Sequence, residues 1–276
     1  MRPIKLVSAT QVPRGMFWSA TYLGRSLRRF PEALRPPLQV VCGNSGTGAR
    51  GLSEIFNQAL DMTDPDTDLV FVHDDVYLND WFLGTHVAQA LQNFDVVGLA
   101  GSANPDLSQP AWGLHFDAQL NPLGWQPGLR RSGAVNHFDY SCPDVTVYGP
   151  APMRCALLDG MFIAVRTSVL AERGVRFDPR FRFHCYDIDL CRSALEKGLR
   201  IGTWPIAVTH NSGGAFGSGS FKEAARLYLE KWPAPARVAA PAQPPASPEP
   251  ALAAAGLGAR SELRRPPSEA PEASVF

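Results

Sequence analysis

The amino-acid sequence predicts an α/β fold in which a mixed, mainly parallel sheet is flanked by helices. Short apolar runs, typical of buried strands, alternate with segments whose apolar residues recur at helical spacing. The clearest strand is Leu69–Val72, a continuous apolar run. The clearest helix is Ser53–Leu60, where apolar side chains fall every three to four residues. Strands that alternate with helices indicate βαβ units, and such units place their strands in parallel.

The remaining elements continue this alternation, with one interruption. Further strands are expected at Ile4–Ala9, Leu38–Cys42, Val96–Ala100 and Ile201–Thr209, and regular structure returns at Cys155–Val165. Further helices are expected after Asn79, which can cap a helix through about Leu91, and from Asp187 to Lys197. Residues 101–150 lose the rhythm and are rich in Gly, Pro, Asn and aromatic residues. We expect them to form a long irregular insertion, a kind of segment that is usually functional.

One globular domain is expected over residues 1–232, followed by a disordered tail over residues 233–276. The chain has 276 residues, of which 45% are hydrophobic and 19% are charged, so a sizeable core can form. The tail holds ten of the 25 prolines and no aromatic residue before Phe276. Such a segment cannot bury enough apolar surface to offset the entropy of ordering it.

Charge and cysteine content restrict the partners and the compartment. The formal net charge is zero, which does not favour nucleic acid or an anionic membrane as the partner. The five cysteines include no CxxC pair, so reduced, buried thiols and a cytoplasmic location are expected. No apolar run approaches the ~18 residues of a transmembrane segment. Peripheral contact with a membrane stays open.

The strongest local sign of a site is the pair Asp74-Asp75, which lies one residue beyond the predicted buried strand. Ligands bind at the carboxyl ends of strands in open α/β sheets. Adjacent carboxylates there are costly unless a cation or hydrogen-bond donors compensate their charge. Their oxygen atoms suit Mg²⁺ or Mn²⁺ bound together with substrate phosphates, although a solvated turn can have the same sequence.

Two later segments carry weaker signs of chemistry. Asp187 and Asp189 stand at a predicted helix start, where carboxylates are favoured by free N–H groups. Because side chains two residues apart on a helix point in different directions, one of them can face a site while the other caps the helix. His210 ends a predicted strand and can either ligate a metal or make a structural hydrogen bond.

Taken in this order, the segments resemble the nucleotide-sugar glycosyltransferases that have the GT-A fold. Asp74-Asp75 looks like their DxD-type metal motif, residues 158–166 resemble the segment before their catalytic acid, and residues 186–191 resemble their acidic helix start. The stretch 198–201, then Pro205 and His210, completes the pattern. The resemblance covers about residues 4–232 and is closest to family-2-like transferases of the type found in streptomycin-biosynthesis clusters.

This resemblance implies a Rossmann-like GT-A sheet and a metal-dependent, inverting transfer of a sugar from a nucleotide-sugar donor. The acceptor would be a glycan, a lipid-linked molecule or another hydroxyl compound, on the side of residues 101–150. Asp75 and His210 would bind Mn²⁺ or Mg²⁺, and Asp187 would be the catalytic base. The residues expected to bind the nucleotide sugar are Thr10, Asn44, Arg50, Asp74, Asp159 and Gly160.

Three positions depart from the family pattern. Val72 stands where many members have an acidic residue, and Asn44 follows the second strand where many have an aspartate that contacts the base. Tyr186 replaces the acid that precedes Asp187, which leaves Asp187 as the candidate base.

Two other functions remain open at this stage. A catalytically silent nucleotide-sugar-binding protein would have the same fold, because a fold alone does not guarantee chemistry. The joint presence of Asp75, Asp187 and His210 argues against it. A sugar-nucleotide nucleotidyltransferase would be expected to have a Gly-rich, basic loop after the first strand, and residues 10–15 are a poor version of one.

Overall fold

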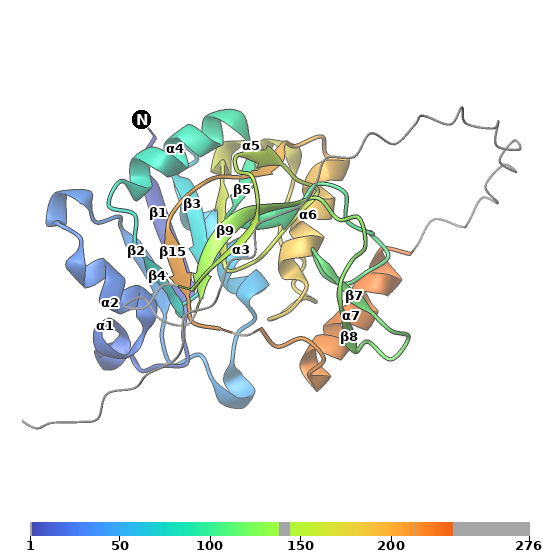
Figure 1. Ribbon diagram of the computed structural model, residues 1–276. Helices are drawn as coiled ribbons and strands as arrows, with labels where there is room; N and C mark the ends of the chain where they lie inside the picture. Colours follow the sequence, from blue (N-terminus) through green and yellow to red (C-terminus); the bar gives the residue numbers. More distant parts are fainter. Residues whose placement is uncertain (1, 138–143, 213, 234–276) are drawn as a thin grey trace, which may run out of the picture. The chain divides into compact units, whose positions relative to one another are not determined.

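The structure is a computed structural model that describes residues 2–137, 144–212 and 214–233, and it confirms the predicted α/β class (Figure 1). The central sheet has the strand order β11-β14-β5-β13-β3-β1-β2. Its strands are β1 (Ile4–Ala9), β2 (Leu38–Val41), β3 (Asp68–Val72), β5 (Val96–Gly98), β11 (Met153–Arg154), β13 (Phe162–Val165) and β14 (Ile201–Thr203). The predicted tail lies outside the described residues except for Pro233.

The central sheet is mixed and mainly parallel. Strands β1, β2 and β3 pair in parallel, as do β5 and β14. Strand β13 lies between β3 and β5 and is antiparallel to both, so β3 and β5 run the same way. Five strands therefore share one direction, and their carboxyl ends meet at one edge of the sheet.

Seven helices surround this sheet in the described part of the chain. They are α1 (Phe17–Ala20), α2 (Tyr22–Arg29), α3 (Leu52–Met62), α4 (Leu83–Asn93), α5 (Thr167–Arg173), α6 (Tyr186–Glu196) and α7 (Gly219–Lys231). Helices α3 and α4 contact β1, α5 contacts β3, and α6 contacts β14. Strand β3 is buried along its whole length, and Phe71 packs against Phe56 of α3 with ring centroids 4.6 Å apart.

A second sheet is built largely from the segment that the sequence predicts to be irregular. Its order is β12-β6-β9-β15-β4, and β10 also pairs with β9. Its strands are β4 (Val76–Leu78), β6 (Ala100–Ser102), β9 (Arg131–His137), β10 (Asp144–Gly149), β12 (Leu157–Leu158) and β15 (Val208–His210). A separate hairpin joins β7 (Leu114–Phe116) to β8 (Pro122–Trp125).

The described part of residues 101–150 therefore contains more regular structure than the sequence predicts, because strands β7, β8, β9 and β10 lie within it. Their strands are short and separated by turn residues, so no long hydrophobic alternation marks them in the sequence. Gly133 illustrates how a glycine hides a strand: it lies inside β9 with φ of 103°, and a Cβ there would lie 1.8 Å from the Leu99 carbonyl oxygen. Only glycine fits this close approach between neighbouring strands.

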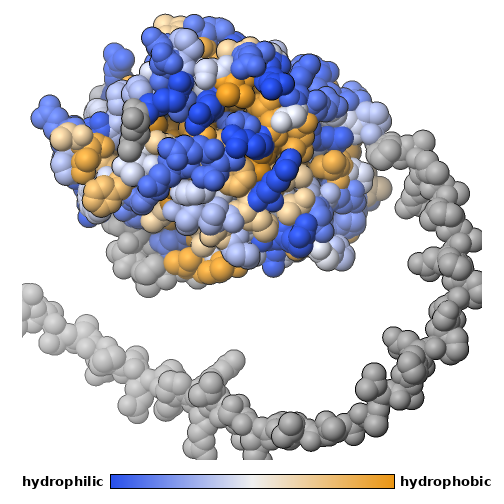
Figure 2. All heavy atoms as spheres, turned by 90° about the horizontal axis from the view of Figure 1, so that it is seen from above, coloured by the Kyte–Doolittle hydropathy of each residue, from blue (hydrophilic) through white to orange (hydrophobic). Residues whose placement is uncertain are grey.

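The surface shown in Figure 2 is mostly hydrophilic, with hydrophobic residues in separate groups. Among the large apolar side chains at the surface, Trp125 is 45% exposed and Trp81 is 41% exposed. No helix in the described ranges combines the length and the apolar character needed to cross a bilayer.

Candidate active site

The candidate active site lies at the turn that follows strand β3. Residues 73–75 leave the buried end of β3 and lead directly into β4, which pairs with β15 so that Val76 lies opposite His210. The backbone N–H of Asn211 donates to the carbonyl of Asp75 at 3.0 Å, which ties the end of β15 to this turn. Residues more than a hundred positions apart are thereby brought together.

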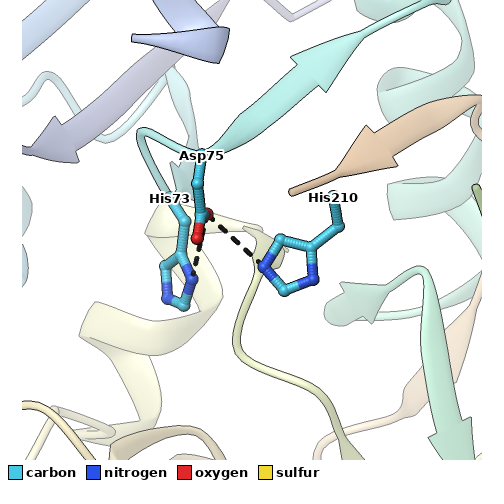
Figure 3. A group of neighbouring side chains, drawn as sticks. All are labelled: His73, Asp75 and His210. Carbon is cyan, nitrogen blue, oxygen red and sulfur yellow. Dashed lines mark ion pairs between the residues drawn. The ribbon is translucent and has the colours of Figure 1, made fainter. Parts of the chain in front are cut away.

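His73, Asp75 and His210 form a compact group at this point (Figure 3). One ligand atom from each side chain lies within 4.8 Å of the others. Asp75 Oδ1 is 3.4 Å from His210 Nε2 and 3.9 Å from His73 Nδ1. Asp75 Oδ1 and His210 Nε2 are buried, and neither makes a hydrogen bond within the described part of the chain. Two imidazole nitrogens and a carboxylate oxygen pointing at one another suit a divalent metal ion.

Tyr186 sets which nitrogen of His73 faces Asp75. The Tyr186 hydroxyl donates to the Gly160 carbonyl oxygen at 3.0 Å and lies 2.6 Å from His73 Nε2. Because its single proton is donated to Gly160, the hydroxyl accepts a hydrogen bond from the N–H at His73 Nε2. Nδ1 of His73 then keeps its lone pair and faces Asp75. Such a partner behind a ligating imidazole fixes the ring orientation and its tautomer.

The charges of the group respond to burial and to one another. Burial alone would raise the pKa of Asp75, but the adjacent His210 and the charge of His73 together lower it. Burial tends to lower the pKa of His210, yet interaction with Asp75 raises it overall. The pKa of His73 is lowered, chiefly by burial. The pKa of Asp74 is raised by burial and by the adjacent Asp75, although a hydrogen bond with Thr10 opposes this shift.

A cavity of about 560 Å³ lies at the carboxyl ends of β1, β2 and β3. Thr10, Asn44 and Asp74, which the sequence analysis assigns to the nucleotide sugar, line it together with the expected metal ligand Asp75. The Asn44 side chain, however, is engaged with its own loop, since its amide donates to the Arg50 carbonyl and accepts from the Arg50 N–H.

Arg50 itself does not line either of the two cavities beside the metal group. Its guanidinium pairs with Glu54 at 2.6 Å, one helical turn further on. The structure therefore gives no support to a direct contact between its side chain and the donor, and its backbone closes the 44–50 loop instead.

A second cavity, of about 220 Å³, lies on the other side of the metal group. Asp159, Gly160 and Asp187 line it together with His73 and His210. Gly160 allows helix α6 to approach, because a Cβ at this position would lie 2.6 Å from the Tyr186 hydroxyl and 3.0 Å from Asp187 Cβ. The role that the structure shows for Gly160 is therefore to allow close packing of α6.

Asp187 is a half-buried carboxylate in this second cavity. Burial, and next the negative charge of Asp159, raise its pKa to about 7. Hydrogen bonds with the backbone of Ile188 and Gly160 oppose this shift. A carboxylate whose pKa lies near neutrality can accept a proton at physiological pH.

Asp189 points elsewhere, as the helical geometry predicts for two residues in this spacing. Its side chain is fully buried, lies 2.7 Å from Lys231 Nζ and accepts a hydrogen bond of 2.8 Å from Trp232 Nε1. Asp189 therefore joins α6 to the end of α7.

The structure also identifies residues that sequence reasoning did not assign. His73 lies inside the motif already noted, so its position beside the acidic pair was an available signal. Tyr186 was seen only as a departure from the family pattern, and no sequence signal connects it to His73, which is 113 positions away.

Comparisons with known proteins give similar folds but no family. No protein-family profile and no curated protein matches this chain. Among solved structures, A197 from STIV is 11% identical with a TM-score of 0.40, over 74% of this chain and 82% of that chain. TarS from S. aureus is 15% identical with a TM-score of 0.43, over 83% of this chain and 39% of that chain.

A further similar structure is GalNAc-T7 with UDP, GalNAc and Mn²⁺, which is 14% identical with a TM-score of 0.45, over 84% of this chain and 48% of that chain. This chain thus spans less than half the length of TarS and of GalNAc-T7. Likenesses at this level say nothing about activity, and the chemistry of this chain has to come from its own residues.

Proposed function

We propose that this chain is a metal-dependent glycosyltransferase of the GT-A type, which transfers a sugar from a nucleotide-sugar donor to a hydroxyl acceptor. One observation carries the proposal: the group His73, Asp75 and His210 lies on the border between two cavities. Asp75 lines the larger cavity, His210 lines the smaller one, and His73 lines both. A metal ion held there would have a donor site on one side and the carboxylate of Asp187 on the other.

The larger cavity suits the nucleotide part of the donor. It lies at the carboxyl ends of parallel strands, where open α/β sheets bind nucleotides. When bound, a divalent cation would neutralise the charge that develops on the departing diphosphate. Asp74, held by Thr10, is free of any Lys or Arg partner among the described residues and is available to ribose hydroxyls.

The smaller cavity suits the reacting hydroxyl. In the transfer, the acceptor oxygen forms a bond to the anomeric carbon, and the bond from that carbon to the diphosphate breaks. The proton of the acceptor hydroxyl goes to the carboxylate of Asp187. Its raised pKa fits this role, because a base whose pKa lies near the working pH transfers protons efficiently. A single displacement of this kind inverts the anomeric configuration.

The ligand atoms of the metal group favour Mn²⁺ over Mg²⁺. Mg²⁺ favours oxygen ligands in octahedral geometry, whereas imidazole suits transition metals. Two of the three side chains here are histidines. We therefore infer that Mn²⁺ restores activity at lower concentration than Mg²⁺.

The family-2-like, streptomycin-cluster subtype belongs to this proposal as well. Its support is the order of the motifs at residues 74–75, 158–166 and 186–191. Residues 101–150 are proposed to contribute the acceptor side.

A screen of nucleotide sugars tests the function directly. Each donor is tested for thermal stabilisation and for release of the nucleoside diphosphate, with Mn²⁺ and with EDTA. The proposal expects at least one donor to stabilise the protein and to be turned over only with metal, and expects Asp75→Asn to lose both effects. Stabilisation without any turnover, in the presence of acceptors, would identify a silent binding protein instead.

A further inference from the structure

Three aromatic side chains gather beside the proposed catalytic cavity and form what we name the aromatic cluster: Trp112, Trp125 and Tyr148. The ring centroids of Trp112 lie 5.4 Å from Trp125 and 5.3 Å from Tyr148, and those of Trp125 and Tyr148 lie 5.8 Å apart. All three come from residues 101–150, a segment that otherwise forms short strands. Their mutual contacts hold the rings in a fixed arrangement.

The aromatic cluster lines a cavity of about 320 Å³ that adjoins the cavity of Asp187. Trp112, Asp159 and His210 line both cavities. A molecule held against the rings therefore lies next to His210 of the metal group and to Asp159, which also border the cavity of Asp187. The donor cavity lies on the other side of this group and shares none of the three rings.

Trp112 links this cavity to the catalytic carboxylates. Its Nε1 donates to Asp159 Oδ2 at 2.9 Å, and the charge of Asp159 is the second largest cause of the raised pKa of Asp187. Trp112 is buried, so it is a wall of the cavity and a support for Asp159 at once. Trp125 differs: it is 45% exposed, and its ring edge packs on the backbone at Gly113, where a Cβ would lie 2.6 Å from Trp125 Cζ3.

The mixture of ring faces and polar groups identifies the class of ligand. Arg131 lies over the Trp125 ring, with its guanidinium carbon 4.6 Å from the ring centroid. His137 Nε2 lies 3.1 Å from the Tyr148 hydroxyl. A saccharide ring has the matching character, because its C–H face packs on aromatic rings while its hydroxyls bond to polar neighbours. The polar atoms that line this cavity beside the rings, on Tyr148, Asp159 and His210, offer hydrogen bonds to sugar hydroxyls that a plain alkyl chain cannot make.

We propose that the aromatic cluster is the acceptor subsite and that the acceptor is a saccharide whose ring packs against Trp125. This inference rests on the proposed function, since it takes the cavity of Asp187 to be the place of transfer. A sugar held there would direct a hydroxyl past Trp112, Asp159 and His210, which line both cavities, toward Asp187. The rigid indole of Trp125 supplies contact area at little cost in conformational entropy.

Trp125→Ala is the test, with Trp81→Ala as the matched control. Trp81 is 41% exposed, packs on Phe30 and lines none of the cavities described above. Binding is measured by saturation-transfer NMR with methyl glycosides of glucose, galactose, mannose and N-acetylglucosamine, and with glycerol and octanol as alcohols without a sugar ring. Transfer to the same compounds is measured with the donor found in the nucleotide-sugar screen.

We expect at least one methyl glycoside to bind the unchanged protein, and Trp125→Ala to raise its KM or Kd about tenfold, which corresponds to about 1.4 kcal/mol. The change in donor Kd should be smaller than this, Trp125→Phe should recover part of the loss, and Trp81→Ala should behave like the unchanged protein. An equal KM in Trp125→Ala and the unchanged protein would overturn the inference. Preference for octanol or glycerol over every glycoside would overturn it as well.

The binding measurement separates the two proposals. If no nucleotide sugar is turned over but a glycoside still binds at Trp125, the proposed function fails and the saccharide site stands. If a donor is turned over with metal but Trp125→Ala leaves every acceptor unaffected, the proposed function stands and the acceptor subsite fails.

Discussion

Two regions of this molecule contain buried or half-buried carboxylates that are compensated differently. In the contact between α6 and α7, Asp189 lies 2.7 Å from Lys231 Nζ, and Asp178 lies 2.7 Å from Arg180 and 3.0 Å from Lys231. Around the two catalytic cavities, Asp74, Asp75, Asp159 and Asp187 have no Lys or Arg partner among the described residues.

The difference separates a structural region from a chemical one. A buried carboxylate that keeps a permanent cationic partner stabilises one arrangement of helices. Carboxylates gathered without such partners repel one another and favour a bound cation or a bound proton. At the cavities, Asp75 faces two imidazoles and Asp187 has a pKa raised to about 7. We infer that Asp75 binds the metal ion and that Asp187 accepts the proton.

Removal of metal should have the largest effect on turnover. It also tests most directly whether the carboxylates at the cavities bind a cation. With EDTA, turnover of the nucleotide sugar should fall below detection, and Mn²⁺ should restore it, because the leaving diphosphate has no Lys or Arg partner from the described cavity linings. The measurement is release of nucleoside diphosphate. Full activity in EDTA would mean that the uncompensated carboxylates serve no cation.

Asp187→Asn should have the next largest effect, on kcat. The substitution keeps the shape of the side chain and removes its ability to accept a proton. A positioned base typically contributes about 10²–10⁴-fold, so kcat should fall by that order while the donor Kd changes little. Asp189→Asn serves as the control on the same helix. A dead Asp189→Asn beside an active Asp187→Asn would exchange the two assignments.

The ionisation of Asp187 should make both kcat and stability depend on pH. Its folded pKa of about 7 lies above the ordinary carboxyl value, so kcat should rise with pH and level off above about 8. A raised carboxyl pKa also means that ionisation opposes folding, so the stability present at low pH is lost as pH rises toward 7. Without metal at pH 8, Asp187→Asn should therefore melt at a higher temperature than the unchanged protein. An unchanged or lower Tm would show that the carboxylate is compensated after all.

Tyr186→Phe should have an intermediate effect, on metal affinity. The loss of the hydroxyl removes the partner of His73 Nε2 and frees the imidazole to adopt the other tautomer. Partners of this kind are typically worth about 10–100-fold in metal affinity or activity. Titration with Mn²⁺, followed by calorimetry, measures the change. Tyr228→Phe, at a buried tyrosine that contacts Arg192, is the matched control and should keep the affinity.

The features that the sequence predicts are those encoded by neighbouring residues. Strand β3 and the acidic pair Asp74-Asp75 are separated by His73 alone, so the end of the strand and its candidate ligands are recognised together. The separation of Asp187 from Asp189 follows from helical spacing alone. Long-range assembly is harder to predict: the pairing of Val76 with His210 brings the metal group together, and no local pattern encodes this pairing.

Single residues explain two errors in the predicted bounds of strands and helices. The predicted strand Ile201–Thr209 is two strands in two different sheets, because Trp204-Pro205 interrupts it and proline cannot donate a ladder hydrogen bond. The helix predicted from Asn79 begins at Leu83, since the Asn79 side chain donates to Thr209 instead of capping. In both cases a tertiary contact or a proline outweighs the hydrophobic pattern.

Asp189→Asn should have the smallest effect on activity, and it tests the compensated region. Asparagine can still accept the hydrogen bond from Trp232 Nε1, but it removes the negative charge beside Lys231 and turns amide protons toward that cation. Loss of one partner of a buried ion pair is destabilising, here by about 2 kcal/mol because Lys231 keeps Asp178. For a domain of this size that corresponds to a fall in Tm of roughly 4–8 °C.

The control for this variant is Asp61→Asn, which removes a surface pair with Arg176 and should change stability by less than about 1 kcal/mol. Thermal unfolding of both variants, with kcat measured below the transition, separates the two regions. If Asp189→Asn loses activity at a temperature where it remains folded, the α6–α7 contact takes part in the chemistry. In that case a permanent cationic partner no longer distinguishes a structural carboxylate from a catalytic one.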